Sequence, residues 1–545
     1  MVQIKISNKI IYSLILLVVL LGFIGFVFAQ PDISFGHLAR DVYVYISEEW
    51  FSLQDAIDEG LIGGGSEPSG FGEGLSGWAI KEITQSGHGN TFCVIRNDDR
   101  VSCSGYNSQG QIGIGDTIRR ITFKENPSLE NVKKLSAGML HFCALYEEAG
   151  KGKIKCWGYN GYGQLGVGDN KNRLNPTKVI GLESENIIDV QIRKAFTGDY
   201  YTENTCALAQ SGKIYCWGYN HDTHGTLGNG ENGHKYTPTQ VSDINNAVKF
   251  VLGGHSTGGY GCALLSDGTV KCWGYNGYGQ LGDGTKTSRK TPIQVSTLNS
   301  LSVIDIIATP SDYGTTCALI DDGTIRCWGR NNDGQVGSGN KGDSEILTPT
   351  PVINIDGINS KATKIVSSGA GTRTSFCALL EDKTVKCWGD NRDGRIGLSS
   401  SATSNVCLDG KCGCRASSTS VNCYAEPVSV PGLSNIKDVQ LTAWGDTGYG
   451  CALLSDGTVK CWGYNGYGQL GVGDTITRFQ PTDIQLSGYS VNKLFLTMDI
   501  GKTRGQAHST AIVLSDNTPR VWGYNANGGL GTGDTNHYRV PVSAL

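Results

Sequence analysis

Cysteine is the residue type whose spacing in this 545-residue chain points most directly to chemistry, because 18 cysteines are present and most occur in pairs. Two thiols can form a disulfide bond, or they can supply two of the four ligands of a zinc ion. No histidine directly adjoins these pairs, so a zinc site would lack ligands, and we predict disulfides. The seven predicted bonds join Cys93 to Cys103, Cys143 to Cys156, Cys206 to Cys216, Cys262 to Cys272, Cys317 to Cys327, Cys377 to Cys387 and Cys451 to Cys461.

A β-hairpin is the element that would position each pair. In the segment CALLSDGTVKC at 262–272, short apolar runs flank the turn Ser266-Asp267-Gly268, and a three-residue loop with a left-handed glycine is a standard hairpin connection. Counting outward from the turn places Cys262 opposite Cys272, where Cα atoms about 4.5–5.5 Å apart suit a disulfide. In the last copy both positions change together, to Ala511 and Val521, as bonded partners would.

A second motif, G-x-G-x-x-G, occurs in CWGYNGYGQLGVGD, which stands at 156–169 and again at 461–474. A dinucleotide-binding loop with this pattern follows a strand and opens a helix. Here Gly161, Gly163 and Gly166 follow a hairpin strand and lead into Asn175-Pro176-Thr177. We therefore interpret the glycines as turn residues and predict no cofactor.

These motifs belong to a repeat of about 53–74 residues, a period suited to one four-stranded sheet per unit. An eighth, weaker copy carries Ser104 in place of tryptophan. Seven copies contain a Trp-Gly pair, and their tryptophans are Trp157, Trp217, Trp273, Trp328, Trp388, Trp462 and Trp522.

The unit H-x-C-A-L, S-D-G-T-V-x-C-W-G-x-N, G-x-G-Q-L-G-x-G-D resembles the repeat of the regulator of chromosome condensation family over about residues 80–545. The resemblance implies an all-β fold, a β-propeller of four-stranded blades. Propellers of that family usually have seven blades, whereas the eight units here favour eight. We further expect the C-terminal segment 540–545 to complete the blade that opens near Trp78.

The N-terminus predicts export. Lys5 and Lys9 precede an apolar run over 10–29, and Val27 and Ala29 are small residues that signal peptidase accepts, so 1–29 is a signal peptide or, alternatively, an uncleaved membrane anchor. Either way we expect the rest of the chain outside the cell or at its surface, in an oxidising compartment that permits disulfides. The membrane would be contacted only through this segment.

Three smaller regions complete the predicted organisation: a collar over 30–60, a glycine-rich linker over 61–77 and a propeller over 78–545. In the collar, the alternation of Val42, Val44 and Ile46 predicts a strand, and Ser52 with Asp55 predicts a capped helix that ends at Gly60.

An insertion over 399–424 contains four further cysteines. Neighbouring positions make a bond between Cys412 and Cys414 sterically poor, so two pairings into disulfides remain, and zinc held by all four thiolates is the alternative. The insertion is either an element specific for a partner or a disulfide-tied decoration. Its cysteines are Cys407, Cys412, Cys414 and Cys423.

Histidines are the main candidates for a metal-binding or catalytic site. We assign His141, two residues before Cys143, to the structure of the repeat, and the cluster His221, His224 and His234 is either a polar loop or a metal site. No Ser/His/Asp or Cys/His set stands in a catalytic context.

The predicted function is a binding module for an extracellular protein or glycan. A net charge of −4 gives no field that would attract nucleic acid. The alternatives are a secreted enzyme acting on polysaccharide or peptide and a structural envelope component. The tyrosines of the Y-N-G-Y loops would supply contact area or pack between blades; they include Tyr159, Tyr162, Tyr275 and Tyr278.

Overall fold

The computed structural model divides the chain into two compact units, Met1–Phe71 and Gly72–Leu545. It describes residues 3–6, 42–46, 49–52, 79–88, 91–195, 201–254, 258–311, 313–339, 344–368, 373–398, 423–444, 447–486, 488–498 and 508–544. Over these residues no helix has the length and apolar character needed to cross a bilayer. The predicted hydrophobic helix, the linker and most of the Cys-rich insertion lie outside the described residues, so their boundaries stay predictions.

The first unit contains a three-stranded antiparallel sheet of β1 (Gln3–Ile6), β2 (Val42–Ile46) and β3 (Glu49–Ser52), in that order. The strand predicted from the alternation of Val42, Val44 and Ile46 is confirmed as β2. Val44 lies opposite Ile4 on one side and Phe51 on the other. The predicted capped helix lies outside the described residues, apart from Ser52, which ends β3.

The second unit is a β-propeller of eight four-stranded antiparallel sheets, which confirms the all-β fold and the blade number favoured by the repeats. We number the blades 1 to 8 along the chain. Blades 1 to 4 are β4 (Ile80–Gln85), β5 (Phe92–Arg96), β6 (Val101–Gly105) and β7 (Arg120–Glu125); β8 (Val132–Ala137), β9 (His141–Glu148), β10 (Lys151–Gly158) and β11 (Arg173–Lys178); β12 (Ile187–Arg193), β13 (Asn204–Ala209), β14 (Ile214–Gly218) and β15 (Lys235–Gln240); β16 (Ala247–Gly253), β17 (Tyr260–Leu265), β18 (Val270–Gly274) and β19 (Arg289–Gln294). Blades 5 to 8 are β20 (Val303–Ala308), β21 (Thr315–Ile320), β22 (Ile325–Arg330) and β23 (Glu345–Pro351); β24 (Ala362–Ser367), β25 (Ser375–Leu380), β26 (Val385–Asp390) and β27 (Cys423–Ser429); β28 (Ile436–Trp444), β29 (Thr447–Leu454), β30 (Val459–Gly463) and β31 (Arg478–Asp483); β32 (Val491–Met498), β33 (His508–Leu514), β34 (Pro519–Gly523) and β35 (Tyr538–Val542).

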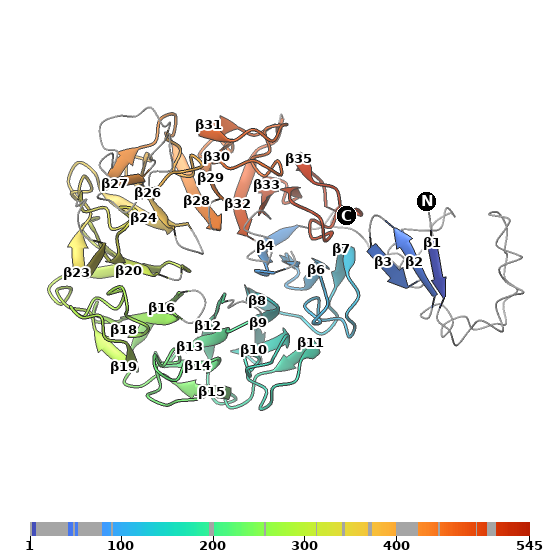
Figure 1. Ribbon diagram of the computed structural model, residues 1–545, viewed down its shortest axis with the longest axis horizontal. Helices are drawn as coiled ribbons and strands as arrows, with labels where there is room; N and C mark the ends of the chain where they lie inside the picture. The colour runs from blue at the N-terminus through green and yellow to red at the C-terminus, as the bar shows by residue number, and fades with distance from the viewer. Residues whose placement is uncertain are drawn as a thin grey trace, which may run out of the picture. The chain divides into compact units, whose positions relative to one another are not determined.

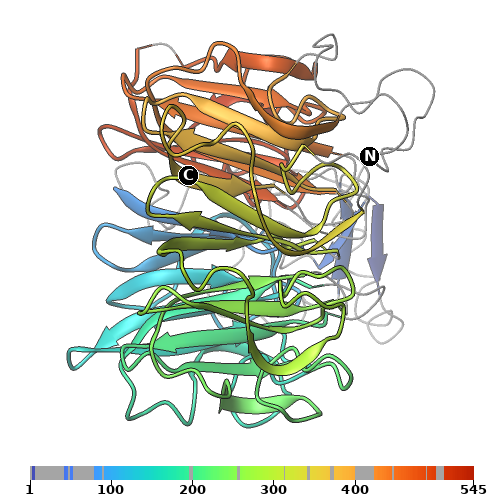
Figure 2. The same ribbon diagram turned by 90° about the vertical axis from the view of Figure 1, so that its left-hand side faces the viewer.

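Each blade runs in chain order from the axis of the ring to its rim, as Figure 1 shows. Because successive strands are antiparallel, the connections from first to second strand and from third to fourth strand leave the same end of a blade. We call that end of the propeller the loop face, and the end with the tight turns between second and third strands the hairpin face. Figure 2 shows the ring from the side, with the strands running from one face to the other.

The expectation that the C-terminal segment completes the first blade is wrong. β35 pairs with β34 and is the fourth strand of its own blade, and Arg289–Gln294 has the same place in blade 4. The ring closes by side-chain packing instead, because Ile80 and Phe92 of blade 1 share a buried cluster with Ala511 and Val513 of blade 8. Every blade is therefore one continuous segment.

The seven predicted disulfides are present, and each joins directly opposed positions of the second and third strands of a blade. In every pair the Cα atoms lie 4.1 Å apart, slightly closer than the expected range, and Cys262 opposes Cys272 as the hairpin register predicts. The bonds join Cys93 to Cys103, Cys143 to Cys156, Cys206 to Cys216, Cys262 to Cys272, Cys317 to Cys327, Cys377 to Cys387 and Cys451 to Cys461.

The remaining cysteines and the one blade without a disulfide complete this pattern. In blade 8, Ala511 and Val521 occupy the opposed positions that cysteines occupy elsewhere. Cys423 of the insertion is also disulfide-bonded. The predicted pairing of Cys407, Cys412 and Cys414 lies outside the described residues.

The seven tryptophans are fully buried and join neighbouring blades. Trp217 of blade 3 donates its indole N–H to the carbonyl of Gln164 in blade 2 at 2.9 Å. Gly166 (φ +69°) lies against the same indole, where an added Cβ would stand 2.7 Å from Nε1. The repeated glycines thus make room for the tryptophan of the next blade as well as forming turns.

Blade 1 has no tryptophan at this position and contacts blade 8 through other side chains. Ser104 donates its hydroxyl to the carbonyl of Gly529 in blade 8 at 2.7 Å, which replaces the indole hydrogen bond. Phe123 from β7 fills the space beside Gly531.

Candidate binding surface on the loop face

Buried asparagines hold the long connections between third and fourth strands. Asn160 accepts a hydrogen bond from the backbone N–H of Leu165 at 2.9 Å and donates to the carbonyls of Asp169 and Lys171 at 2.9 and 3.0 Å. No role was predicted for this residue, although it stands two positions after Trp-Gly in seven units and two positions after Ser104-Gly105 in blade 1. The equivalent residues, all buried, are Asn107, Asn160, Asn220, Asn276, Asn331, Asn391, Asn465 and Asn525.

On the loop face, the connection between third and fourth strands is hydrogen-bonded to the connection between first and second strands of the same blade. The backbone N–H of Tyr159 donates to the carbonyl of Leu140, and that of Tyr275 donates to Gly259, each at 3.0 Å. These hydrogen bonds fix the loops in place. The loop face is therefore well suited to present side chains to a partner.

Tyrosine and histidine rings run along this face through blades 1 to 5, and we call this group the aromatic arc. Its members are partly exposed and contact one another, for example Tyr162 and Tyr219 with centroids 5.3 Å apart, and Tyr278 and Tyr313 with centroids 4.8 Å apart. The arc consists of His88, Tyr106, Tyr159, Tyr162, Tyr201, Tyr219, His221, His224, His234, Tyr275, Tyr278 and Tyr313.

The predicted Y-N-G-Y tyrosines therefore pack against neighbouring blades and keep part of each ring exposed. Burial raises the pKa of Tyr159, Tyr219 and Tyr278, so their hydroxyl groups stay protonated near neutral pH.

The three clustered histidines belong to the arc. The rings of His221 and His224 stack with centroids 4.0 Å apart, and His234 stacks on Tyr219 while its Nδ1 accepts the backbone N–H of Asn220 at 3.1 Å. Burial lowers the pKa of His221 and His234, which favours their neutral forms. Among the described residues, no group of three or more His, Cys, Asp or Glu side chains is arranged to hold a metal ion.

His141 lies in a buried network between blades 2 and 3. Its Nδ1 lies 2.9 Å from Oε2 of Glu203, and its Nε2 lies 3.1 Å from Oγ1 of Thr205. This order of groups is that of a catalytic triad, but all three side chains are fully buried and Thr205 donates its hydroxyl to the carbonyl of Gln164. In this conformation the network binds one blade to the next and has no access to a substrate.

A charged cluster continues the loop face across blades 5 and 6. Buried Asp390 lies 3.1 Å from the guanidinium groups of both Arg392 and Arg395, and Arg392 lies 3.5 Å from Asp333. Burial raises the pKa of Asp390 to about 7, with a further increase from Asp333, while the charge of Arg395 lowers it. Burial likewise raises the pKa of Asp333.

Sequence reasoning missed this cluster, although a signal was present. The residue after Trp-Gly, or after Ser104-Gly105 in blade 1, is tyrosine in six units, and it changes only to Arg330 in blade 5 and Asp390 in blade 6. The Cys-rich insertion begins at residue 399 in the same connection of blade 6, between β26 and β27.

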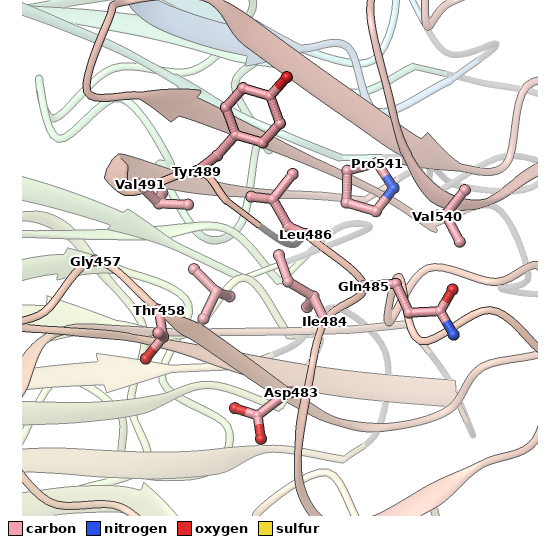
Figure 3. Close-up of a pocket in the computed structure, with 11 residues that line it drawn as sticks. Gly457, Thr458, Asp483, Ile484, Gln485, Leu486, Tyr489, Val491, Val540 and Pro541 are labelled. Carbon is pink, nitrogen blue, oxygen red and sulfur yellow. The ribbon is translucent and has the colours of Figure 1, made fainter.

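A groove of about 650 Å³ lies between blades 7 and 8 on the side of the hairpin face (Figure 3). Leu486, Tyr489, Val540 and Pro541 supply apolar walls, and Asp483, which pairs with Lys460 at 2.9 Å, is the one charged side chain among its lining residues. The groove lacks the converging polar groups typical of a specific small-molecule site.

Four-stranded blades with a disulfide between their central strands, joined by tryptophans and carrying an aromatic loop face, define a β-propeller of repeated hairpin units. The chain contains regulator of chromosome condensation (RCC1) repeats: the family model described as "Regulator of chromosome condensation (RCC1) repeat" matches residues 151–202, 211–259, 267–309 and 322–378. A second model with the same description matches residues 365–395 and 448–469. The predicted resemblance is confirmed.

Relatives with this repeat have diverse names. The chain is 27% identical over 312 residues to the ultraviolet-B receptor UVR8 of Arabidopsis thaliana, which covers 56% of this chain and 66% of the relative. It is 27% identical over 324 residues to the E3 ubiquitin-protein ligase HERC2 of Mus musculus, which covers 58% of this chain but 6% of the relative. The chain thus spans less than two thirds of the length of either protein.

Among solved structures, Prp20p of Saccharomyces cerevisiae is similar with a TM-score of 0.51 and 19% sequence identity, covering 76% of this chain and 90% of that one. At this identity the likeness supports the fold.

Proposed function

We propose that the chain is an exported, surface-associated propeller that binds a partner protein through the aromatic arc. The observation that carries this proposal is the arc itself: partly exposed tyrosine and histidine rings held on hydrogen-bonded loops across five blades. Tyrosine gives a large, rigid contact area with a polar tip at a small entropic cost, which suits protein recognition. The similar propeller Prp20p is described as binding Gsp1p and histones, which are proteins.

Export is supported by the lysine-flanked apolar run at 10–29 and by the seven bonded cysteine pairs, which need an oxidising compartment to persist. The test is acid quenching of cells to stop thiol exchange, then alkylation of the free thiols in denaturant at mildly basic pH, followed by mass analysis of the chain. An exported chain should carry intact disulfides at Cys262 and Cys272, whereas alkylation of both thiols would contradict export.

Site-specific photo-crosslinking tests the binding face. A photoreactive amino acid at Tyr162 or Tyr278 in the full chain should yield the same protein adduct on cells. The matched controls carry it at Asp267 or Asp516, in turns of the hairpin face, and should give none. Adducts from the control positions alone would overturn the proposal.

Two further outcomes are informative. An adduct at the arc that a glycosidase removes would assign a glycan instead of a protein. Deletion of 399–424 that abolishes the adduct, with the melting temperature unchanged, would identify the Cys-rich insertion as the partner-specific element; an unchanged adduct would leave that role to the arc.

A further inference from the structure

The third residue of the first strand alternates in charge around the whole ring. First strands lie nearest the axis, and each neighbours those of the adjoining blades (Figure 1). Odd-numbered blades carry an acidic residue at this position and even-numbered blades carry lysine. In blade order the residues are Glu82, Lys134, Asp189, Lys249, Asp305, Lys364, Asp438 and Lys493.

A shared backbone irregularity positions all eight residues. In every blade the pairing between first and second strands shifts register immediately before this residue, as between Ile187 and Asp189. Such a bulge bends the strand and redirects the side chain that follows. The charged positions are therefore equivalent in all blades.

Three of the four lysines form an ion pair with the acid of the next blade, and the fourth, Lys493, donates to the carbonyl of Lys81 in blade 1 at 2.9 Å. Lys134 pairs with Asp189 at 2.5 Å, Lys364 pairs with Asp438 at 2.5 Å, and Lys249 pairs with Asp305. Where the ring closes, burial raises the pKa of Glu82, and the charges of Lys134 and Lys493 partly oppose this increase.

Glutamines two residues further along link two of the remaining boundaries. Gln191 donates to Asp189 at 2.9 Å and to the carbonyl of Phe250 in the next blade at 2.9 Å. Gln440 donates to Asp438 at 3.2 Å and to the carbonyl of Leu494 at 2.6 Å. Each of these two carboxylates is thus bound by the lysine of the preceding blade and by a glutamine of its own blade, and that glutamine also bonds to the next blade.

We infer that this alternating ring acts as a single device that favours an even number of blades and fixes which blades adjoin. Tryptophan and glycine surfaces are nearly the same at seven of the eight boundaries, so apolar packing alone does not distinguish most blades from one another. Alternating charges do distinguish them, because like charges would meet at one boundary of any ring with an odd number of blades. The repeating unit of the ring is then a pair of blades.

A charge swap in the full chain tests the inference. In Lys249→Asp/Asp305→Lys the pair keeps opposite charges. The new carboxylate then has Asp189 at the equivalent position of the neighbouring strand β12, and the new ammonium has Lys364 at the equivalent position of β24. The reference is the neutral pair Lys249→Gln/Asp305→Asn, which loses the ion pair without creating repulsion. Urea unfolding should give the swapped chain an equilibrium constant for folding about tenfold lower than that of the neutral chain.

Independent ion pairs predict the opposite order, so a swapped chain as stable as the native protein would overturn the inference. The matched control is the swap Glu148→Lys/Lys178→Glu, an exposed pair outside the ring, which should leave stability unchanged.

Where the swapped chain does not fold, two more substitutions decide the cause. Adding Asp189→Asn and Lys364→Gln removes both new repulsive contacts and should restore folding. Failure to restore it, with the neutral chain folded, would show that repulsion was not the cause.

Discussion

The indole nitrogen of Trp217 donates to the carbonyl oxygen of Gln164 at 2.9 Å, across the boundary between blades 2 and 3. Six other tryptophans make the equivalent bond to the preceding blade, at 2.7 to 3.3 Å. The motif that resembles a nucleotide loop thus forms one side of the contact between two blades, through the carbonyl of Gln164 and through Gly166. The tryptophan of the next blade forms the other side.

The first prediction concerns that glycine. Gly166→Ala should lower the free energy of unfolding by about 2 kcal/mol more than Gly181→Ala does. Both positions have positive φ, +69° and +82°, but an added Cβ meets Trp217 at position 166 and no atom within 4 Å at position 181. Urea unfolding of the two variants isolates the steric term. Equal losses would show that the indole moves aside without cost.

The second prediction is an added disulfide in blade 8. Ala511→Cys/Val521→Cys should bond spontaneously under oxidising conditions, because the two residues are opposed in the same register as the native pairs. The bond should raise the free energy of unfolding by about 2–3 kcal/mol. Mass spectrometry without reductant checks the bond, and each single cysteine variant is the control. Two free thiols would contradict the register.

The third prediction copies blade 8 into blade 4. Cys262→Ala/Cys272→Val should fold and lose about 2–3 kcal/mol of stability, since the strands keep apolar partners but lose the covalent constraint on the unfolded chain. Comparison of urea midpoints with and without reductant provides the check, because reductant should destabilise the native chain more than the variant. A variant that no longer folds would show that this bridge is needed for folding itself.

The fourth prediction is a pH dependence from the cluster in blades 5 and 6. Asp390 has its pKa raised by burial from its ordinary 3.8 to about 7, so the folded protein binds this proton more tightly than the unfolded chain does. Stability from this group is therefore greatest below about pH 4, falls as pH rises toward about 7, and is constant above. Asp390→Asn should flatten that slope in urea unfolding. An unchanged slope would mean that Arg392 and Arg395 hold the carboxylate charged.

Local features were predictable from the sequence. The turn Ser266-Asp267-Gly268 and the spacing of Cys262 and Cys272 determine a register that involves only adjacent strands, and eight copies of the unit predict eight blades. The prediction for the C-terminus is wrong because Val540–Val542 belongs to the fourth strand of its own blade, as Thr291–Ile293 does in blade 4.

Features that depend on contacts between blades were not predicted. The pairing of Lys134 with Asp189 joins residues 55 positions apart, and the approach of Arg392 to Asp333 depends on which loops share a face. The alternating charges lie in the first strands, outside the cysteine and Trp-Gly motifs that define the repeat.

Blades 8 and 1 share no strand, so the contact between them is of the same kind as the contact between any two consecutive blades. Ala544 and Ile80 lie in one buried cluster, so a short linker could join the two ends of the ring. The break in the chain could then be moved to another junction, such as that between β15 and β16, without cutting a blade. A circular permutant made in this way would retain every hydrogen bond within each sheet, and synthesis could start from any blade.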